Sequence, residues 1–355
     1  MTHALRVLVF LLLTLALPVT GFGADKKPVV AVLATGGTIA GGAESDTATI
    51  GYKAAVFGVD KLLAAVPSLG RVADIRAEQV FQLASENMTP AHWLVLGKRV
   101  NQALKDPDVA GVVITHGTDT LEETAYFLNL TVRSDKPVVI TGSMRPATAI
   151  SADGPINLFN AVCLAASPEA RGKGVFILMN DTIFAARDTT KTNTFRTDTF
   201  AAPDTGPLGV MQLGRPLFHR LPVRAHTVST EFDIATLTSL PQVEILYGYA
   251  GSHPAQVTGA LATGARGIVN AGTGNGSLPD ASKQAFAGAS AKGVVVVRAS
   301  RTGSGVVTRN GEVDDDALGF VAAGNLTAQK ARVLLALALT VTADRARIQK
   351  MFDTY

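Results

Sequence analysis

Apolar residues gather in short runs along the chain, and stretches of helical periodicity separate these runs. The runs 29–34, 112–115 and 137–141 have the length and β-branched composition of strands that are buried on both faces. Residues 89–100 show the spacing of an amphipathic helix that begins with a threonine cap followed by proline. Because strands alternate with helices at this spacing, we predict right-handed βαβ units and a mainly parallel sheet, the α/β class.

The alternation lapses once, between residues 215 and 240, where three prolines interrupt a stretch of mixed polarity. After this stretch, strands and helices alternate again. We therefore predict a larger N-terminal α/β domain over 24–214, a linker over 215–240, and a smaller C-terminal α/β domain over 241–355. Two domains also suit a chain of 355 residues, which exceeds the usual size of a single domain.

Residues 1–23 have the pattern of a secretory signal peptide. Arg6 supplies a positive charge, residues 7–18 form an apolar segment, and residues 21–24 form a small-residue cleavage site. The apolar segment is too short to span a bilayer comfortably, so we expect cleavage rather than a retained membrane anchor. The mature protein is then exported and has no membrane contact.

Composition excludes several classes of partner. The chain is 47% hydrophobic and 17% charged, which is typical of a globular protein with an ample core. Its formal net charge is only +3 with scattered basic residues, so we predict no nucleic-acid partner. The six histidines lack metal-ligand spacing, and the glycines do not form a dinucleotide fingerprint. We therefore predict no metal and no cofactor.

Cys163 is the only cysteine, which makes an intrachain disulfide impossible. Its neighbours are apolar and have helical spacing, so we expect a buried thiol in the core. Asp153 lies just before this helix and is expected to cap its N-terminus.

Two of the predicted strands lead into a glycine and then a threonine. A glycine pair precedes Thr38, and a single glycine precedes Thr118, which Asp119 follows directly. Open α/β sheets bind ligands at the carboxyl ends of their strands, and glycine allows a ligand to approach the backbone closely. A hydroxyl beside free backbone N–H groups is what acyl transfer requires. The first stretch alone favours a tight turn with an incidental threonine, but its repetition favours chemistry.

These two stretches, ATGGTIAGG and ITHGTDTLEET, resemble the type II, periplasmic L-asparaginase and glutaminase-asparaginase family. The resemblance covers nearly the whole chain after the leader. It implies hydrolysis of the side-chain amides of L-asparagine and L-glutamine to aspartate or glutamate and ammonia. It also implies a threonine nucleophile, no cofactor and a location in the periplasm.

The resemblance implies that Thr38 attacks the amide carbon from a mobile loop. Tyr52, from the same flap over 41–52, then orients or deprotonates Thr38. The flap has the glycine-rich, polar composition of a lid that closes over substrate. It is about one residue longer between Thr38 and Tyr52 than in comparable family members. Without the resemblance, Tyr52 could equally be a plain loop aromatic.

Lys191 completes a threonine–lysine–aspartate set with Thr118 and Asp119, again by resemblance. This set relays a proton or activates water for deacylation, and the sequence does not divide the steps between the two threonines. Taken alone, Lys191 would be a solvated loop residue. A neutral lysine can nevertheless act as a base where burial lowers its pKa. His116, the conventional type of base, stands at a strand end and is predicted to be structural.

A free amino acid presents a carboxylate and an ammonium, which need opposite partners. The resemblance places Ser85 on the carboxylate, Asp119 and Glu86 on the ammonium, and the backbone carbonyl of Ser143 on the amide nitrogen. Members that are strict for asparagine commonly have Ser-Gln where this chain has Ser85-Glu86. We therefore predict that both amides are hydrolysed.

Asn275 and Glu312 match family residues that reach the active site of a neighbouring subunit. Without the resemblance, they would be an Asn-Gly turn and part of a solvated acidic cluster. With it, the protein is predicted to be a homotetramer of two intimate dimers, with active sites shared between subunits.

The alternative function is a periplasmic amino-acid-binding protein without catalysis, which would share the leader and the two α/β domains. The paired threonine motifs with Asp119 and Lys191 count against it, because a binder needs no second activated hydroxyl. A nucleotide-dependent dehydrogenase is weaker still, since the glycine fingerprint is absent.

Overall fold

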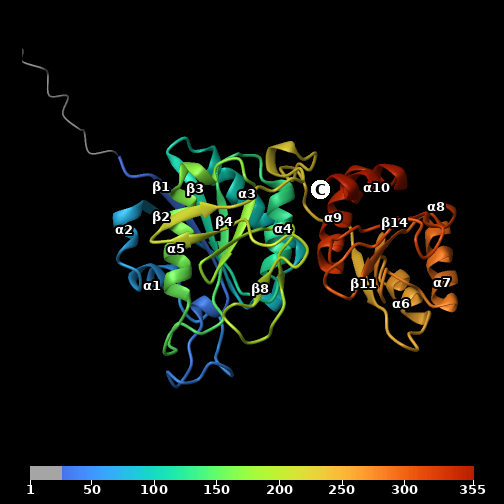
Figure 1. Ribbon diagram of the computed structural model, residues 1–355, viewed down its shortest axis with the longest axis horizontal. Helices are drawn as coiled ribbons and strands as arrows, with labels where there is room; N and C mark the ends of the chain where they lie inside the picture. The colour runs from blue at the N-terminus through green and yellow to red at the C-terminus, as the bar shows by residue number, and fades with distance from the viewer. Residues whose placement is uncertain (1–25) are drawn as a thin grey trace, which may run out of the picture.

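An eight-stranded sheet forms the centre of the larger domain in the computed structural model, which describes residues 26–355 (Figure 1). The strand order is β10-β9-β6-β5-β4-β3-β1-β2. The strands are β1 Val29–Gly36, β2 Asp74–Leu83, β3 Val109–Thr115, β4 Val138–Thr141, β5 Val175–Met179, β6 Thr182–Ala185, β9 Gly209–Gln212 and β10 Arg215–Phe218. The adjacent strands β2, β1, β3, β4 and β5 pair in parallel, in that order, which confirms the predicted parallel sheet. The antiparallel extension through β6, β9 and β10 was not predicted.

Helices cover both faces of this sheet. They are α1 Val59–Ala64, α2 Leu69–Val72, α3 Pro90–Lys105, α4 Leu121–Thr131 and α5 Gly154–Ala166. Alternate residues of a strand point to opposite faces. Val112 and Ile114 of β3 therefore pack in the core beneath α3 and α4, whereas Val113 packs in the core beneath α5, α1 and α2.

The start of α3 follows the predicted signal, but the start of α5 does not. The Thr89 hydroxyl accepts a hydrogen bond from the backbone N–H of His92, so Thr89 caps α3 as expected. Asp153 is the residue before α5, yet its side chain makes no cap hydrogen bond. Its carboxylate instead accepts from the backbone N–H groups of Met144 and Arg145, both at 2.9 Å. The predicted cap is wrong because the β4–α5 loop uses the carboxylate.

The stretch predicted as a linker, 215–240, begins with a strand. Arg215–Phe218 forms β10, the edge strand of the large sheet. Pro216 is compatible with this position because an edge strand has one side without sheet partners. Farther along, the backbone is irregular apart from the 3₁₀ turn Thr227–Ser229, while Phe232 and Ile234 are buried in the core of the larger domain.

A parallel four-stranded sheet organises the smaller domain, in the order β11-β12-β13-β14. Its elements are β11 Val243–Tyr247, α6 Ala255–Ala262, β12 Gly267–Gly272, α7 Asp280–Ala291, β13 Val295–Ser300, α8 Asp315–Leu318, β14 Phe320–Ala322, α9 Ala328–Val341 and α10 Arg345–Thr354. The short elements α8 and β14 were not predicted. This parallel sheet confirms the predicted C-terminal α/β domain.

The two domains share a core through α4 and α9 (Figure 1). Buried apolar residues of α4, such as Phe127, and of α9, such as Leu334, belong to one continuous hydrophobic cluster. Among residues 26–355, no helix is long and apolar enough to cross a membrane. The predicted signal peptide, residues 1–23, lies outside the described residues.

Candidate active site

The two glycine–threonine loops meet where β1 and β3, neighbours in the large sheet, reach their carboxyl ends. Gly37 has a φ of +81°, and a Cβ built on it would lie 2.3 Å from the backbone nitrogen of Gly117. A Cβ on Gly117 would lie 2.6 Å from Oγ of Ser85. Glycine is therefore required at both positions, since the two loops touch through their backbones.

Thr38 begins a 3₁₀ turn, Thr38–Ala40, directly after β1 and is buried. Its Oγ1 lies 2.7 Å from the hydroxyl of Tyr52, which belongs to the flap. Gly42 and Lys53 exchange backbone hydrogen bonds of 2.9 and 3.0 Å, and these bonds fix the base of the flap beside Tyr52. The structure thus joins the predicted nucleophile to the predicted flap tyrosine.

Burial raises the pKa of Tyr52 above its usual value. The hydrogen bond from Thr38 opposes this shift, and the carboxylates of Asp119 and Glu86 add to it. A phenol with a raised pKa remains protonated at neutral pH. Tyr52 therefore reaches Thr38 as a neutral hydroxyl, which can both donate and accept a hydrogen bond.

A second hydroxyl stands at the end of β3 with its own cation. Nζ of Lys191 donates to Oγ1 of Thr118 at 3.0 Å and to Oδ1 of Asp119 at 2.6 Å. Lys191 comes from β7, Thr190–Lys191, which pairs with β8, Phe200–Ala201. Its side chain is 16% exposed, whereas the side chain of Asp119 is 60% exposed. The structure brings the predicted set of three residues together from two distant segments.

The strand end of β2 supplies the adjacent wall. Ser85 begins a 3₁₀ turn, Ser85–Asn87, and its Oγ accepts from the backbone N–H of Asp119 at 3.2 Å. The hydroxyl of Thr120 donates to the backbone oxygen of Ser85 at 2.7 Å. These bonds hold the Ser85-Glu86 pair against the start of α4.

A cleft of about 320 Å³ opens between these loops. Thr38, Tyr52, Ser85, Glu86 and Asp119 all line it. The cleft combines hydroxyl groups with two carboxylates, which suits a small zwitterion that carries an ammonium group. Thr118 and Lys191 are not among the lining residues, and they adjoin the cleft through Asp119.

Ser143 lies on the loop after β4 and is buried. Its hydroxyl donates to the backbone oxygen of Arg145 at 2.7 Å. The preceding residue, Gly142, packs closely on the Thr118 loop, because an added Cβ would lie 3.3 Å from Cγ2 of Thr118. Ser143 therefore belongs to the same group of strand-end loops.

Asn275 and Glu312 lie elsewhere, on loops of the smaller domain. Oδ1 of Asn275 accepts from the backbone N–H of Thr308 at 2.8 Å, and Oε2 of Glu312 accepts from the Ser277 hydroxyl at 3.2 Å. Neither Asn275 nor Glu312 lines the cleft at Thr38. Within one chain, the structure does not bring them to the other predicted site residues.

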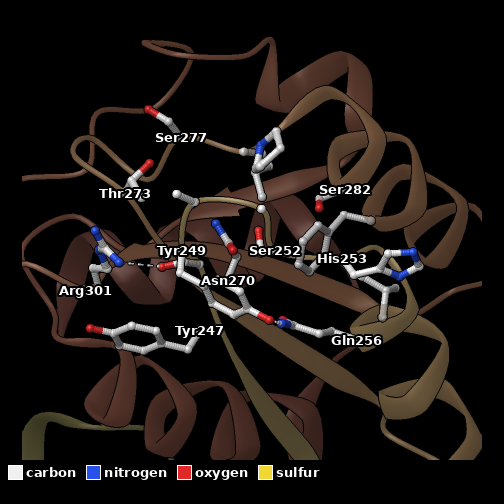
Figure 2. A pocket seen from close by; sticks show the side chains of 17 residues that line it. Tyr247, Tyr249, Ser252, His253, Gln256, Asn270, Thr273, Ser277, Ser282 and Arg301 are labelled. Carbon is white, nitrogen blue, oxygen red and sulfur yellow. Dashed lines mark hydrogen bonds between the residues drawn. The ribbon is translucent and has the colours of Figure 1, made fainter.

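Figure 2 shows a second cleft, of about 400 Å³, at the carboxyl ends of the strands of the smaller domain. Tyr247 and Tyr249 line it, and Arg301 donates to the backbone oxygen of Gly248 at 3.0 Å. Thr273 and Ser277, which flank Asn275 in the sequence, also line it. It shares no lining residue with the cleft at Thr38.

His116 is structural, as predicted. It is fully buried, with Nδ1 2.7 Å from the backbone oxygen of Gly117 and Nε2 3.0 Å from Oγ1 of Thr124. Burial lowers its pKa to about 4, so the ring is neutral at pH 7. Cys163 is buried as expected, and burial raises the pKa of its thiol to about 11. Over residues 26–355, no group of three or more histidine, cysteine or acidic side chains is arranged to hold a metal ion.

Sequence reasoning missed Glu122. Its Oε1 accepts from Oγ1 of Thr190 at 3.0 Å and from the backbone N–H of Lys191 at 3.2 Å. Acidic residues are usual in the first turn of a helix, so Glu122 carries no distinguishing signal in the sequence. Only the fold shows that it supports the strand that carries Lys191.

Comparisons with known proteins agree with this architecture. The family model described as Asparaginase, N-terminal matches residues 29–224, and the Glutaminase/Asparaginase C-terminal domain model matches residues 242–352. An L-asparaginase 2 from Bacillus subtilis is 51% identical over 93% of this chain and 88% of its own length. A glutaminase-asparaginase from Pseudomonas fluorescens is 47% identical over 93% of this chain and 91% of its own length.

A solved structure gives the same result for the fold. The crystal structure of a probable cytoplasmic L-asparaginase from Campylobacter jejuni matches with a TM-score of 0.90 and 47% identity. The match covers 93% of this chain and all of that one. The chain therefore belongs to the asparaginase family of amidohydrolases.

Proposed function

We propose that this protein hydrolyses the side-chain amides of L-asparagine and L-glutamine and releases ammonia. The observation that carries the proposal is the presence of two hydroxyls at adjoining strand ends, one lining the cleft and one beside it, each with its own polar partner. The hydroxyls of Thr38 and Tyr52 lie 2.7 Å apart, and Oγ1 of Thr118 lies 3.0 Å from Nζ of Lys191. A site that only binds an amino acid has no use for two such hydroxyls.

In the proposed reaction, Oγ1 of Thr38 forms a bond to the amide carbon while its proton leaves through Tyr52 or through the Thr118–Lys191 pair. Collapse of the tetrahedral intermediate breaks the carbon–nitrogen bond, and the nitrogen departs as ammonia after it takes up the proton that Thr38 has lost. Water then attacks the resulting ester and restores the Thr38 hydroxyl. Backbone N–H groups at the glycine-rich strand end stabilise the oxyanion in both steps.

Substrate recognition follows from charge. The carboxylates of Asp119 and Glu86 line the cleft and bind the substrate ammonium. The Ser85 hydroxyl binds the substrate carboxylate, and the backbone oxygen of Ser143 accepts from the amide nitrogen. The Ser85-Glu86 pair and the printed name of the Pseudomonas relative both support activity on glutamine as well as asparagine.

We further propose that the active form is a homotetramer in which Asn275 and Glu312 complete a neighbour's site. Both residues lie on loops away from their own chain's cleft, and Glu312 is exposed. Their place outside the cleft of their own chain supports a role at the site of a second subunit. Sedimentation of the purified protein, with activity measured on dilution, tests this proposal, because a fully active monomer would exclude it.

Export to the periplasm rests on the leader pattern of residues 1–23. The Campylobacter relative is titled as probably cytoplasmic, so membership in the family alone does not decide location. N-terminal sequencing of protein from a periplasmic extract tests the proposal. We expect a mature chain that begins near Ala24, and an intact Met1 in the cytosolic fraction would refute export.

The experiment that tests the function is ammonia release by residues 24–355 with L-asparagine and L-glutamine in parallel. We expect ammonia from both amides. Release from asparagine alone would keep the mechanism and exclude the glutaminase activity. If neither amide is hydrolysed, but each raises the melting temperature, the protein is an amino-acid-binding protein instead.

A further inference from the structure

A lysine lies inside the contact between the two domains, although ammonium groups are rarely buried. Lys330 stands in the first turn of α9 and is 1% exposed. Its Nζ donates to the backbone oxygen of Arg187 at 2.8 Å and also to that of Thr189. Burial lowers its pKa to about 8, and the nearby Glu122 carboxylate opposes this shift.

The Glu122 side chain faces Lys330 from α4 and is nearly as buried. Its Oε2 lies 3.7 Å from Nζ of Lys330 and has no hydrogen-bond partner among residues 26–355. Its Oε1, as described above, accepts from Thr190 and from the backbone N–H of Lys191. The same carboxylate therefore links the interdomain lysine to the strand that carries Lys191.

Together these two side chains hold the segment 187–191 at four points. Lys330 binds the backbone oxygens of Arg187 and Thr189, while Glu122 binds Thr190 and the backbone of Lys191. The segment has little regular structure of its own, because β7 is only two residues long. Contacts from α4 and α9 therefore add to the pairing of β7 with β8 in fixing the segment. The segment ends at the amine that reaches Thr118 and Asp119.

Stability alone gives no reason for charges at this place. Replacement of a buried ion pair by apolar residues is often neutral or even stabilising. The rest of this face of α9 is apolar, with Ala331 and Leu334 fully buried. This charged pair is costly to bury, and it contacts the backbone next to Lys191. The placement of Lys191 explains the pair better than stability does.

We propose that Lys330 is a positioning residue for Lys191, so that the smaller domain sets the geometry of an active site built on the larger one. The proposal rests on the proposed function, because it assigns Lys330 a part only if Lys191 acts in the reaction. Lys330 itself does not line the cleft at Thr38.

The first test is Lys330→Met, which keeps the length and apolar stem of the side chain and removes its donors. We expect kcat for asparagine to fall about 100-fold, the size of effect that a small misplacement of a reacting group can cause. KM should change by less than about threefold, because the cleft residues that bind the substrate keep their own contacts.

Arg332→Met is the matched control. Arg332 lies on the same helix and faces Glu123 across the same interface at 3.9 Å, and its hydrogen bond goes to the backbone of Val243.

A double-mutant cycle separates positioning from a merely structural role. In a Lys191→Met background, Lys330→Met should lower the residual activity by less than about threefold, since its effect passes through Lys191. A full 100-fold further loss in that background would overturn the proposal. Full activity of Lys191→Met itself would refute the proposed role of Lys191, and the positioning role with it.

The variant Glu122→Gln/Lys330→Met guards against simple misfolding. In this double variant the glutamine oxygen still accepts from Thr190 and Lys191, and no unpaired carboxylate is left buried. The melting temperature of the double variant should therefore lie closer to that of the wild type than the melting temperature of Lys330→Met does. We expect its kcat to remain low despite this recovery. If activity recovers along with stability, Lys330 only balances the charge of Glu122 and the proposal fails. An inactive wild type would refute the proposed function rather than this inference.

Discussion

Arg298 and Asp315 form an ion pair, with both side chains 0% exposed, beneath the loops of the smaller domain. Nε and Nη2 of Arg298 meet the two carboxylate oxygens at 2.5 and 2.6 Å. The same guanidinium donates to the backbone oxygens of Asn275 and Thr308, each at 3.0 Å. One buried side chain therefore holds both the loop that carries Asn275 and the strand-end loop that leads to Glu312.

The structure allows the cost of breaking this pair to be estimated. Arg298→Met removes the guanidinium and leaves the Asp315 carboxylate buried with no opposite charge. It also takes the donor from the backbone oxygens of Asn275, Gly276 and Thr308. Loss of one partner from a buried ion pair costs about 3–5 kcal/mol. We therefore expect the free energy of unfolding of the smaller domain to fall by about this amount. Arg298→Met/Asp315→Asn should recover at least about 1 kcal/mol, because it removes the uncompensated charge.

Urea unfolding followed by far-UV circular dichroism measures the change at a fixed protomer concentration. Trp93, the only tryptophan, lies on α3 of the larger domain, and its ring faces Arg332 of α9, so its fluorescence reports the contact between the two domains. We expect the dichroism transition of Arg298→Met to move to lower urea. A loss below about 1 kcal/mol, or a double variant no more stable than the single one, would refute the reasoning about the buried charge.

Two further predictions concern the flap and the domain contact. Tyr52→Phe removes the 2.7 Å hydrogen bond to Thr38 and should lower kcat for asparagine by about 10- to 100-fold with an unchanged melting temperature; wild-type turnover would contradict a role for the hydroxyl. Burial raises the pKa of Glu123 to about 7, and the charge of Arg332 opposes this shift. The contribution of the Glu123 carboxyl to stability is therefore fully present below about pH 4.5 and is lost as the pH rises through about 7. Glu123→Gln should therefore be more stable than the wild type by roughly 2–3 kcal/mol at pH 8, a difference that shrinks toward pH 4; an equal difference at both pH values would contradict the raised pKa.

The sequence was enough to predict the parallel part of the large sheet and to place a glycine and a threonine after each of two of its strands. Long apolar runs mark buried strands, and the carboxyl ends of neighbouring parallel strands must lie at one edge. Thr38 and Thr118 are therefore brought together by topology. The antiparallel strands β9 and β10 were missed because they are only four residues long and lack a continuous apolar run. The strand β6 is apolar over 183–185, but only two residues separate it from the end of β5, so the pattern did not separate it from β5.

Contacts between distant segments could not be predicted from local pattern. Asp153 stands where a helix cap is expected, yet the neighbouring loop at Met144 takes its carboxylate. Glu122 and Lys330 are far apart in the sequence, and only the docking of α9 on α4 brings them to within 3.7 Å. The roles of the site residues come from the resemblance to the family, since no local pattern distinguishes Lys191 from a solvated loop lysine.

The central claim is that Thr38 is the nucleophile at the end of β1. Ammonia release from asparagine by Thr38→Ala, compared with Thr38→Ser, tests it most directly, because serine keeps a hydroxyl at the same position and alanine does not. We expect Thr38→Ala to lose at least about 10³-fold in kcat, while Thr38→Ser retains measurable turnover and both variants fold. Turnover by folded Thr38→Ala at close to the wild-type rate would contradict it.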